Sequence, residues 1–299
     1  MELDPAQLRA LDATVRAGTL EAAARSLHLT PSAVSQRLRA LEIATGRVLL
    51  VRSKPVQVTE SGAAVLRLAR QIDLLTADTA RELGGATADR PPVLPIAVNA
   101  DSMNTWVLPA LAPLAAEYTL ELHREDQEHT SALLRAGAVM AAITTEADPV
   151  PGCAVTRLGR MRYRPMAAPD FAARWFPDGP TPEALRRAPV VVFDRKDDLQ
   201  HRYLRRRLGP DADPPAHSVP ASADFLAAIV LGFGWGMALD LQQPGGELVE
   251  LDPDGAVDVV LHWQQWKLRS PSLDRVREAI ARAAQDHLDQ ADSGAATRS

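Results

Sequence analysis

The sequence contains a single cysteine, Cys153, among its 299 residues. One cysteine excludes a disulfide within the chain and any metal site built from several thiolates. No run of the sequence reaches the roughly 20 apolar residues that a membrane-spanning helix needs. The first residues include early acidic side chains and no apolar segment of the signal-peptide type. We therefore expect a cytoplasmic protein without a membrane span.

Motifs of catalysis and of metal binding are also missing. The seven histidines show neither HxxxH nor HExxH spacing, and no G-x-S-x-G motif occurs. The glycine-rich stretch 232–236, GFGWG, is expected after a helix and before a strand, whereas a dinucleotide-binding fingerprint needs the reverse order. We expect no enzyme, no catalytic or metal-binding residues and no cofactor.

Charge is distributed unevenly along a chain whose net charge is -5. Residues 1–62 hold eight Lys or Arg against six Asp or Glu, which gives this segment a charge of +2 and leaves -7 for the rest. A mildly basic N-terminal segment on an acidic body is typical of a DNA-binding module joined to another domain.

Residues 19–46 predict two helices joined by a tight turn at His28-Leu29. Thr30 is the candidate N-cap of the second helix, and Pro31 follows at the first helical position, where its missing N–H costs nothing. Gly46 suits the left-handed residue that ends a helix. The apolar stripe of the second helix, which must be buried, consists of Val34, Leu38 and Leu41.

Another face of the second helix is polar. Hydroxyl and amide groups near a helix N-terminus can contact base edges and phosphates, and an arginine can bind phosphate or guanine. The alternative is a solvated face on an ordinary helical hairpin. We favour the DNA interface because the two helices, the short turn and this face coincide. The residues of the face are Ser32, Ser35, Gln36 and Arg39.

The segments on either side complete a compact head. Residues 5–17 predict a first helix that ends at Gly18. Alternating apolar residues on both sides of Lys54-Pro55 predict a short two-stranded wing. Arg52 and Lys54 of this wing could reach phosphates.

A long helix is expected from Thr59 to about Leu83. Its apolar residues are spaced by 3, 4 and 3, which is a short coiled-coil seam. We favour dimerisation through this seam over packing of the helix on its own body. The seam residues are Val65, Leu68, Ile72 and Leu75.

From Val93 onward, strands alternate with helices. The first series predicts strands at 93–99, 119–125 and 139–145 and helices at 106–118 and 130–136, a βαβαβ unit with a parallel sheet. The second series predicts strands at 161–168, 189–194, 235–239 and 257–263 and helices at 171–175, 199–207, 223–231 and 272–288. Two α/β halves are the expected architecture.

The head resembles that of the LysR-type transcriptional regulators. It carries GTLEAAARSLHLTPSAVSQRLRALE, then TG-x-x-LLVR and VTESG, although the aromatic that the family usually has in the wing is replaced by Leu50. The body is similar to the lysine- and arginine-responsive branch of that family, the ArgP/LysG type. The stretches that carry this similarity are AVNADSMNTWVLPALAPL, FPDG, APVVVFDRKDDL and LHWQQWKLRSP.

The resemblance implies an α/β multi-domain fold: a winged helix-turn-helix head, a dimerising linker helix and a periplasmic-binding-protein-like effector domain of two lobes. It also implies tetramers that bind and bend promoter DNA. RNA polymerase is left open as a further partner. The expected divisions are 1–58 (head), 59–85 (linker helix), 86–92 (hinge), 93–161 with 267–290 (lobe 1) and 162–266 (lobe 2). Carried onto this sequence, Pro31, Ser32, Ser35 and Gln36 fall where the family's recognition helix meets DNA, and Arg52 falls where a wing cation meets phosphate.

Candidate effector residues follow the ends of predicted strands. Ser102 could offer its hydroxyl and backbone N–H groups to a carboxylate, or act only as a helix cap. A lysine or arginine effector needs a carboxylate partner, which Asp101, Asp194 or Asp198 could supply, although a charge run is usually a solvated loop. The full candidate set is Asn99, Asp101, Ser102, Thr144, Thr145, Asp194 and Asp198.

We therefore expect a regulator that activates a basic amino-acid exporter gene in response to lysine or arginine. Repression instead of activation stays open. A second hypothesis is a DNA-organising or replication-inhibiting protein without a ligand-dependent switch. A third, a solute-binding or enzymatic α/β protein with an incidental helical hairpin, is disfavoured by the missing signal peptide and catalytic motifs.

Overall fold

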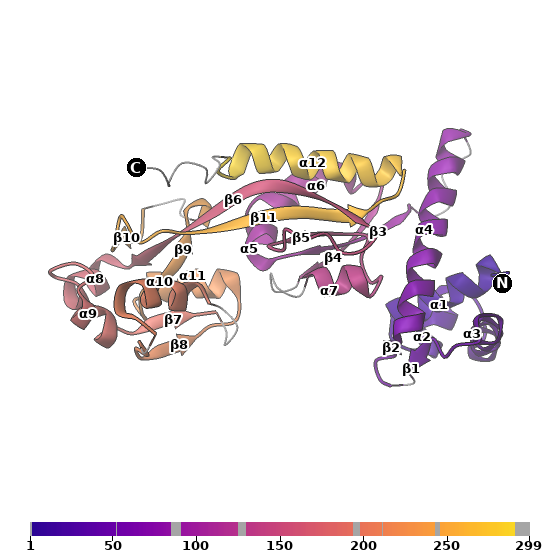
Figure 1. Cartoon of the computed structure of the whole chain (residues 1–299), viewed down its shortest axis with the longest axis horizontal. Coiled ribbons are helices and arrows are strands. Elements are labelled where there is room, and N and C mark those ends of the chain that lie inside the picture. The colour runs from indigo at the N-terminus through magenta and orange to yellow at the C-terminus, as the bar shows by residue number, and fades with distance from the viewer. Residues whose placement is uncertain are drawn as a thin grey trace. The chain divides into compact units, whose positions relative to one another are not determined.

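The computed structural model describes residues 2–51, 53–84, 91–124, 130–193, 198–210, 212–242 and 246–290 (Figure 1). Two of the candidate site residues, Arg52 and Asp194, lie outside these ranges, as does most of the expected hinge. Among the described residues, no helix has both the length and the apolar character required to cross a membrane.

The chain divides into two compact units. Unit 1 comprises 1–99, 111–156 and 263–278. Unit 2 comprises 100–110, 157–262 and 279–299.

The N-terminal part of unit 1 is a winged helix-turn-helix head. Its elements are α1 (Pro5–Ala17), α2 (Leu20–Ser26), α3 (Pro31–Thr45), β1 (Leu50–Val51) and β2 (Gln57–Val58). The two short strands pair antiparallel, with Leu50 opposite Val58. The three helices and the wing therefore lie where the sequence predicts them.

Local capping explains where these helices begin and end. The Thr30 hydroxyl accepts a hydrogen bond from the backbone N–H of Ala33 at 3.2 Å, which satisfies one of the free N–H groups at the start of α3. At the other end Gly46 has a φ of 63°, the left-handed conformation predicted for it. Gly18 ends α1 in the same way, with a φ of 71°.

One hydrophobic core holds the head together. The stripe of α3 formed by Val34, Leu38 and Leu41 is buried in it, as predicted. Leu66 and Ala69 of α4 (Glu60–Glu82) belong to the same core. The long helix is therefore an integral part of the head.

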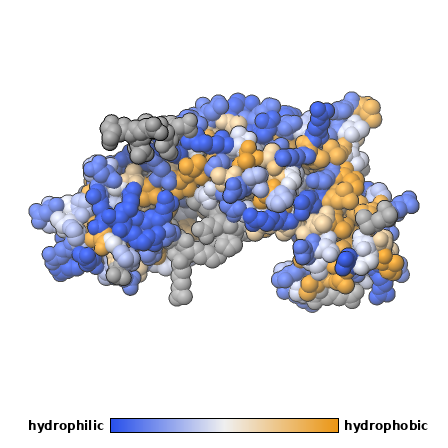
Figure 2. Space-filling view, in the orientation of Figure 1, coloured by the Kyte–Doolittle hydropathy of each residue, from blue (hydrophilic) through white to orange (hydrophobic). Residues whose placement is uncertain are grey.

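The predicted seam of α4 is only partly covered within the chain. Leu68 and Leu75 are 37% and 36% exposed, and Val65 and Ile72 are half-buried. The space-filling view shows hydrophobic surface along this helix (Figure 2).

The rest of unit 1 contains the predicted parallel sheet. Strand β3 (Val93–Val98) pairs parallel with β4 (Thr119–Arg124) on one side and β5 (Ala141–Thr144) on the other. Helix α7 (Thr130–Arg135) precedes β5. The carboxyl ends of β3 and β5 consequently lie at the same edge of the sheet.

Two long strands, β6 (Cys153–Ala167) and β11 (Val257–Trp266), have residues in both units. The strand order of the sheet is β10-β6-β11-β5-β3-β4, and β9 also pairs with β6. Both β9 (Gly236–Leu239) and β10 (Val249–Glu250) run antiparallel to β6.

Unit 2 also contains a small parallel sheet of β7 and β8 and several helices. Its core includes Met166, Val191, Phe225 and Ile229. The remaining elements are β7 (Val190–Val192), β8 (Ala216–Ser218), α8 (Pro169–Trp175), α9 (Pro182–Arg187), α10 (Leu199–Leu208), α11 (Ser222–Val230) and α12 (Pro271–His287), the last with residues in both units.

Three expectations about the body were wrong, and three elements were missed. The helix expected at 106–118 begins earlier, directly after β3. It is a run of helical turns from Ala100 to Leu114. Strand β6 starts at Cys153, eight residues before the expected 161. Strand β11 continues to Trp266, beyond the expected 263. Helix α9 and the short strands β8 and β10 were not predicted.

Candidate functional site

The polar face of α3 is accessible in the head. Ser32, Gln36 and Arg39 are exposed and Ser35 is half-buried, while the apolar stripe of the same helix is buried. Pro31, at the first helical position, is also exposed. The helix thus presents the predicted set of hydroxyl, amide and guanidinium groups outward.

The start of α3 also favours an anion. Thr30 and Ser32 form a hydroxyl–hydroxyl hydrogen bond of 2.9 Å beside the first turn. The positive end of the helix dipole and the N–H groups of the first turn favour phosphate at this place. A DNA backbone could therefore be held here without a charged side chain.

The wing supplies further cations. Lys54 is exposed between β1 and β2, and Arg47 is exposed just before β1. Arg52 lies outside the described residues.

In unit 2, the carboxylate of Asp101 lies beside two neutral donors. The Tyr163 hydroxyl donates to it at 2.8 Å, and the Gln242 amide lies 3.5 Å from its other oxygen. No Lys or Arg of the described residues pairs with this carboxylate. The group is therefore a carboxylate without a compensating cation.

Burial raises the pKa of Asp101 above its usual value of 3.8. The Tyr163 hydroxyl, the Ser222 hydroxyl and the Gln242 amide near the carboxylate act in the opposite direction and lower the pKa. Desolvation is the larger effect, so the pKa of Asp101 is raised, and a positive charge beside the carboxylate would lower it.

Ser102 and Asn99, on either side of the start of this helical run, are both buried. The Ser102 hydroxyl lies 3.5 Å from the sulfur of Met161 within unit 2. Asn99 follows β3 in unit 1, is 2% exposed, and neither its Oδ1 nor its Nδ2 has a hydrogen-bond partner among the described residues. A buried amide without partners is unusual, and a polar ligand would satisfy it.

Thr144 and Thr145 lie at the end of β5 in unit 1. Thr144 is buried, and its hydroxyl accepts a hydrogen bond from the backbone N–H of Glu146 at 3.1 Å. Thr145 is half-buried. Because β3 and β5 are parallel neighbours, these threonines and Asn99 share one edge of the sheet.

Asp198 already has a partner. It stands directly before α10 and accepts a hydrogen bond at 2.6 Å from Arg205 of the same helix. Asp194 is outside the described residues.

Sequence reasoning missed Tyr163, Ser222 and Gln242. They are 62, 121 and 141 residues away from Asp101 along the chain, and no motif around them indicated a site. Within the described ranges, no group of three or more His, Cys, Asp or Glu residues is arranged to hold a metal ion.

Two family models match the chain. Residues 5–63 match the bacterial regulatory helix-turn-helix protein model of the lysR family. Residues 89–285 match the LysR substrate binding domain.

Similar proteins cover almost the whole chain. The HTH-type transcriptional regulator LysG of Mycobacterium tuberculosis is 42% identical over 287 residues, which is 95% of this chain and 94% of that protein. The lysine export transcriptional regulatory protein LysG of Corynebacterium glutamicum is 40% identical over 293 residues, covering 96% of this chain and 99% of that protein.

Solved structures agree with these matches. The crystal structure of ArgP from Mycobacterium tuberculosis superposes with a TM-score of 0.84 at 41% identity, covering 96% of this chain and 99% of that one. Full-length LysG of Corynebacterium glutamicum with bound effector Arg gives a TM-score of 0.73 at 38% identity, with the same coverage. The chain therefore belongs to the LysR family of bacterial helix-turn-helix transcriptional regulators and, within it, to the LysG/ArgP type.

Proposed function

We propose that this regulator activates transcription of a basic amino-acid exporter gene when lysine or arginine binds to its effector domain. Asp101 is the observation that supports a cationic effector. It is a partly buried carboxylate whose hydrogen-bond donors, among the described residues, are all neutral. A cationic group of the effector would supply the missing positive charge. The relatives support the same choice, since one is a lysine export regulator and one was solved with arginine.

The other effector contacts follow from chemistry. The unpartnered amide of Asn99 can bind the polar groups of an amino acid, and Thr144 and Thr145 add hydroxyls at the same sheet edge. We keep Ser102 as a donor to the effector carboxylate through its backbone N–H, because its hydroxyl is directed to Met161. Asp194 stays a candidate from the sequence. Asp198 is the weakest of the candidate effector residues because its carboxylate already pairs with Arg205.

DNA recognition is assigned to the exposed face of α3. Ser32, Ser35, Gln36 and Arg39 would contact base edges and phosphates, with Pro31 starting the helix at the groove. Arg52 and Lys54 of the wing would bind phosphates. Promoter DNA inside the cell is the proposed target, so we place the protein in the cytoplasm.

We further propose that two copies dimerise through α4 and that dimers form a tetramer on the promoter. The partly exposed seam of α4 supports the first step. The division of the chain into 1–58, 59–85, 86–92, 93–161 with 267–290, and 162–266 belongs to this proposal. RNA polymerase is a further candidate partner, and the proposal assigns no catalytic step.

The effector is tested by isothermal titration of the full chain with lysine and with arginine. We expect a saturable heat with one of them, and a loss of affinity of about tenfold or more in Asp101→Asn, since one charged hydrogen bond is removed. The control is Asp240→Asn, an exposed carboxylate that pairs with Arg164. A flat titration with both amino acids would remove the effector assignment but not DNA binding.

The DNA function is tested by footprinting on the promoter of the proposed exporter gene, with and without lysine. A protected site whose extent changes with lysine supports the proposal. Protection that ignores every amino acid and shows no preferred position would favour a DNA-organising protein instead. Gln36→Ala should relax sequence preference, and Lys54→Ala should reduce the salt dependence of binding by about one unit of log–log slope.

A further inference from the structure

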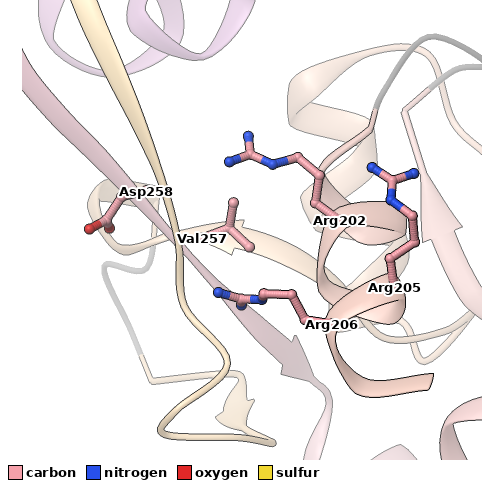
Figure 3. A pocket seen from close by; sticks show the side chains of 5 residues that line it. All are labelled: Arg202, Arg205, Arg206, Val257 and Asp258. Atoms are coloured by element: carbon pink, nitrogen blue, oxygen red, sulfur yellow. The ribbon is translucent and has the colours of Figure 1, made fainter. Parts of the chain in front are cut away.

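Unit 2 contains a pocket of about 340 Å³ between side chains of α10 and β11 (Figure 3). The hollow is open to solvent, so a ligand in it would remain partly exposed. No residue of the candidate effector site lines it. The lining residues are Arg202, Arg205, Arg206, Val257 and Asp258.

The three arginines share one face of α10. They are spaced i, i+3 and i+4, which places them side by side along the helix. Tyr203 and Leu204, on the other side of the helix, are buried. Hydrophilic surface covers the region of α10 in the space-filling view (Figure 2).

The one acid of the pocket does not neutralise these arginines. Its side chain points away from them in the close-up, whereas Val257 points toward them (Figure 3). Asp258 instead receives two hydrogen bonds from Arg162, at 2.8 and 3.0 Å, and lies 3.4 Å from Arg160. The Arg162 guanidinium lowers the pKa of Asp258, so this carboxylate is fully engaged on the other side of β11.

Two of the guanidinium groups have capacity to bind an anion. No hydrogen bond or ion pair connects the Arg202 side chain to any other described residue. Arg206 donates from Nη2 to the carbonyls of Gly255 and Ala256, at 3.0 and 2.9 Å, which fixes its position and leaves Nε and Nη1. Arg205 is paired with Asp198 and adds only to the surrounding potential.

Stabilisation of the helix accounts for part of this arrangement. Arg205 and Arg206 lie in the last turn of α10, where cations interact favourably with the helix dipole. Arg202 lies one turn earlier and gains little from the dipole. An arginine that faces a pocket beside a second arginine, with no acidic partner among the described residues, is therefore not explained by helix stability.

We propose that Arg202 and Arg206 form a binding site for a small phosphate-bearing anion. Guanidinium groups bind phosphate oxygens in pairs of parallel hydrogen bonds. Phosphate carries close to two negative charges near pH 7, which matches two arginines that have no acidic partner within the described part of the chain. A single carboxylate would neutralise only one of them. This regulator thus has a second small-molecule binding site, separate from the effector site at Asp101.

The test is isothermal titration of the full chain with inorganic phosphate and with pyrophosphate at constant ionic strength. We expect a saturable site with a dissociation constant on the order of 1 mM or below for pyrophosphate. Arg202→Gln should weaken it about tenfold and Arg202→Gln with Arg206→Gln further, since each removes charged hydrogen bonds. The affinity of Arg202→Lys, which keeps the charge and loses the planar fork, should lie between those of the wild type and Arg202→Gln.

The matched control is Arg186→Gln, an exposed arginine of α9 outside the pocket. Equal binding by the wild type and the double variant would overturn the proposal, because the anion would then sit elsewhere, for example on the head. Absence of saturation would overturn it too. Acetate binding as tightly as phosphate would overturn the assignment to phosphate. The replaced side chains are exposed, and unchanged thermal unfolding of the variants confirms that they fold.

Discussion

Nε of Arg70 lies 2.7 Å from a carboxylate oxygen of Asp12, and both side chains are buried. The pair joins α4 to α1. The same guanidinium donates to the carbonyl of Gly137 at 2.9 Å and to that of Ala138. One arginine of the linker helix therefore ties the DNA-binding head to the loop that precedes β5, all within unit 1.

Removing one partner of this pair should be costly. Arg70→Met leaves the Asp12 carboxylate buried beside only Arg16 and leaves two carbonyls without a donor, so we expect a loss of about 3–5 kcal/mol in the free energy of unfolding. Urea unfolding measures it. The control is Arg9→Met, an exposed arginine of α1, with an expected effect within about 0.5 kcal/mol. If Arg70→Met lowered the free energy of unfolding no more than Arg9→Met does, the Arg70–Asp12 pair would not stabilise the fold.

The wing is held against α4 at a glycine. A Cβ added to Gly62 would overlap the carbonyl oxygen of Leu49 and lie 2.8 Å from a side-chain carbon of Val58. Gly62→Ala must therefore push the wing away from α4, at a cost of about 1–3 kcal/mol or more. DNA affinity should fall as well, because Lys54 moves with the wing.

Thermal unfolding and anisotropy of labelled DNA measure the two effects. Ser61→Ala, one residue earlier in the same helix, is the matched control and should change neither quantity. If Gly62→Ala changed neither thermal unfolding nor DNA affinity, the wing would not pack against α4 as described.

The head could be predicted in detail because its signals are local. The cap at Thr30, Pro31 after it, the buried stripe at 3.6-residue spacing and Gly46 all lie within 17 residues of sequence. Burial in the wing was less regular: Leu49 is 1% exposed and its neighbour Val48 is 66% exposed. Which of these two side chains is buried depends on the position of α4, and the local sequence pattern gives no information about that position.

The first part of strand β6, residues 153–160, was not predicted, whereas the part from Met161 onward was. Arg160 in the missed part is largely buried and pairs with Asp258 and Asp289, more than 90 residues away. Because these partners are distant in sequence, the local pattern gives no reason to place a charged side chain in a half-buried strand. The same long range explains why Tyr163 and Gln242 were not assigned to Asp101: only the fold brings them together.

The two sides of α4 should respond differently to substitution. Leu66 is fully buried in the head core, so Leu66→Ala should cost about 2–5 kcal/mol of stability. Leu68 and Leu75 are about one-third exposed. Replacing both by Glu should leave the fold of the monomer intact, convert the proposed dimer to monomer and weaken DNA binding, because a charge in a coiled-coil seam loses its solvation.

Light scattering coupled to gel filtration measures the mass of this double variant. Glu60→Gln, an exposed residue at the start of the same helix, is the control and should stay dimeric. A double variant with the mass of the wild type would place the dimer interface on another surface.

Effector binding should depend on pH through Asp101. Its pKa is raised in the free protein by burial, and a cationic effector beside it would lower the pKa, so binding must release a proton wherever the carboxyl is still protonated. Affinity for lysine should therefore fall as the pH drops through the raised pKa of Asp101, by up to about tenfold per pH unit for one proton. A carboxylate whose pKa is already depressed by an arginine would show the same fall only at lower pH. Titrations in buffers of different ionisation heat measure the released proton directly, and Asp101→Asn should abolish both the release and the pH dependence. Lysine affinity that is constant with pH in the wild type, or equally pH-dependent in the variant, would show that another group receives the effector's charge.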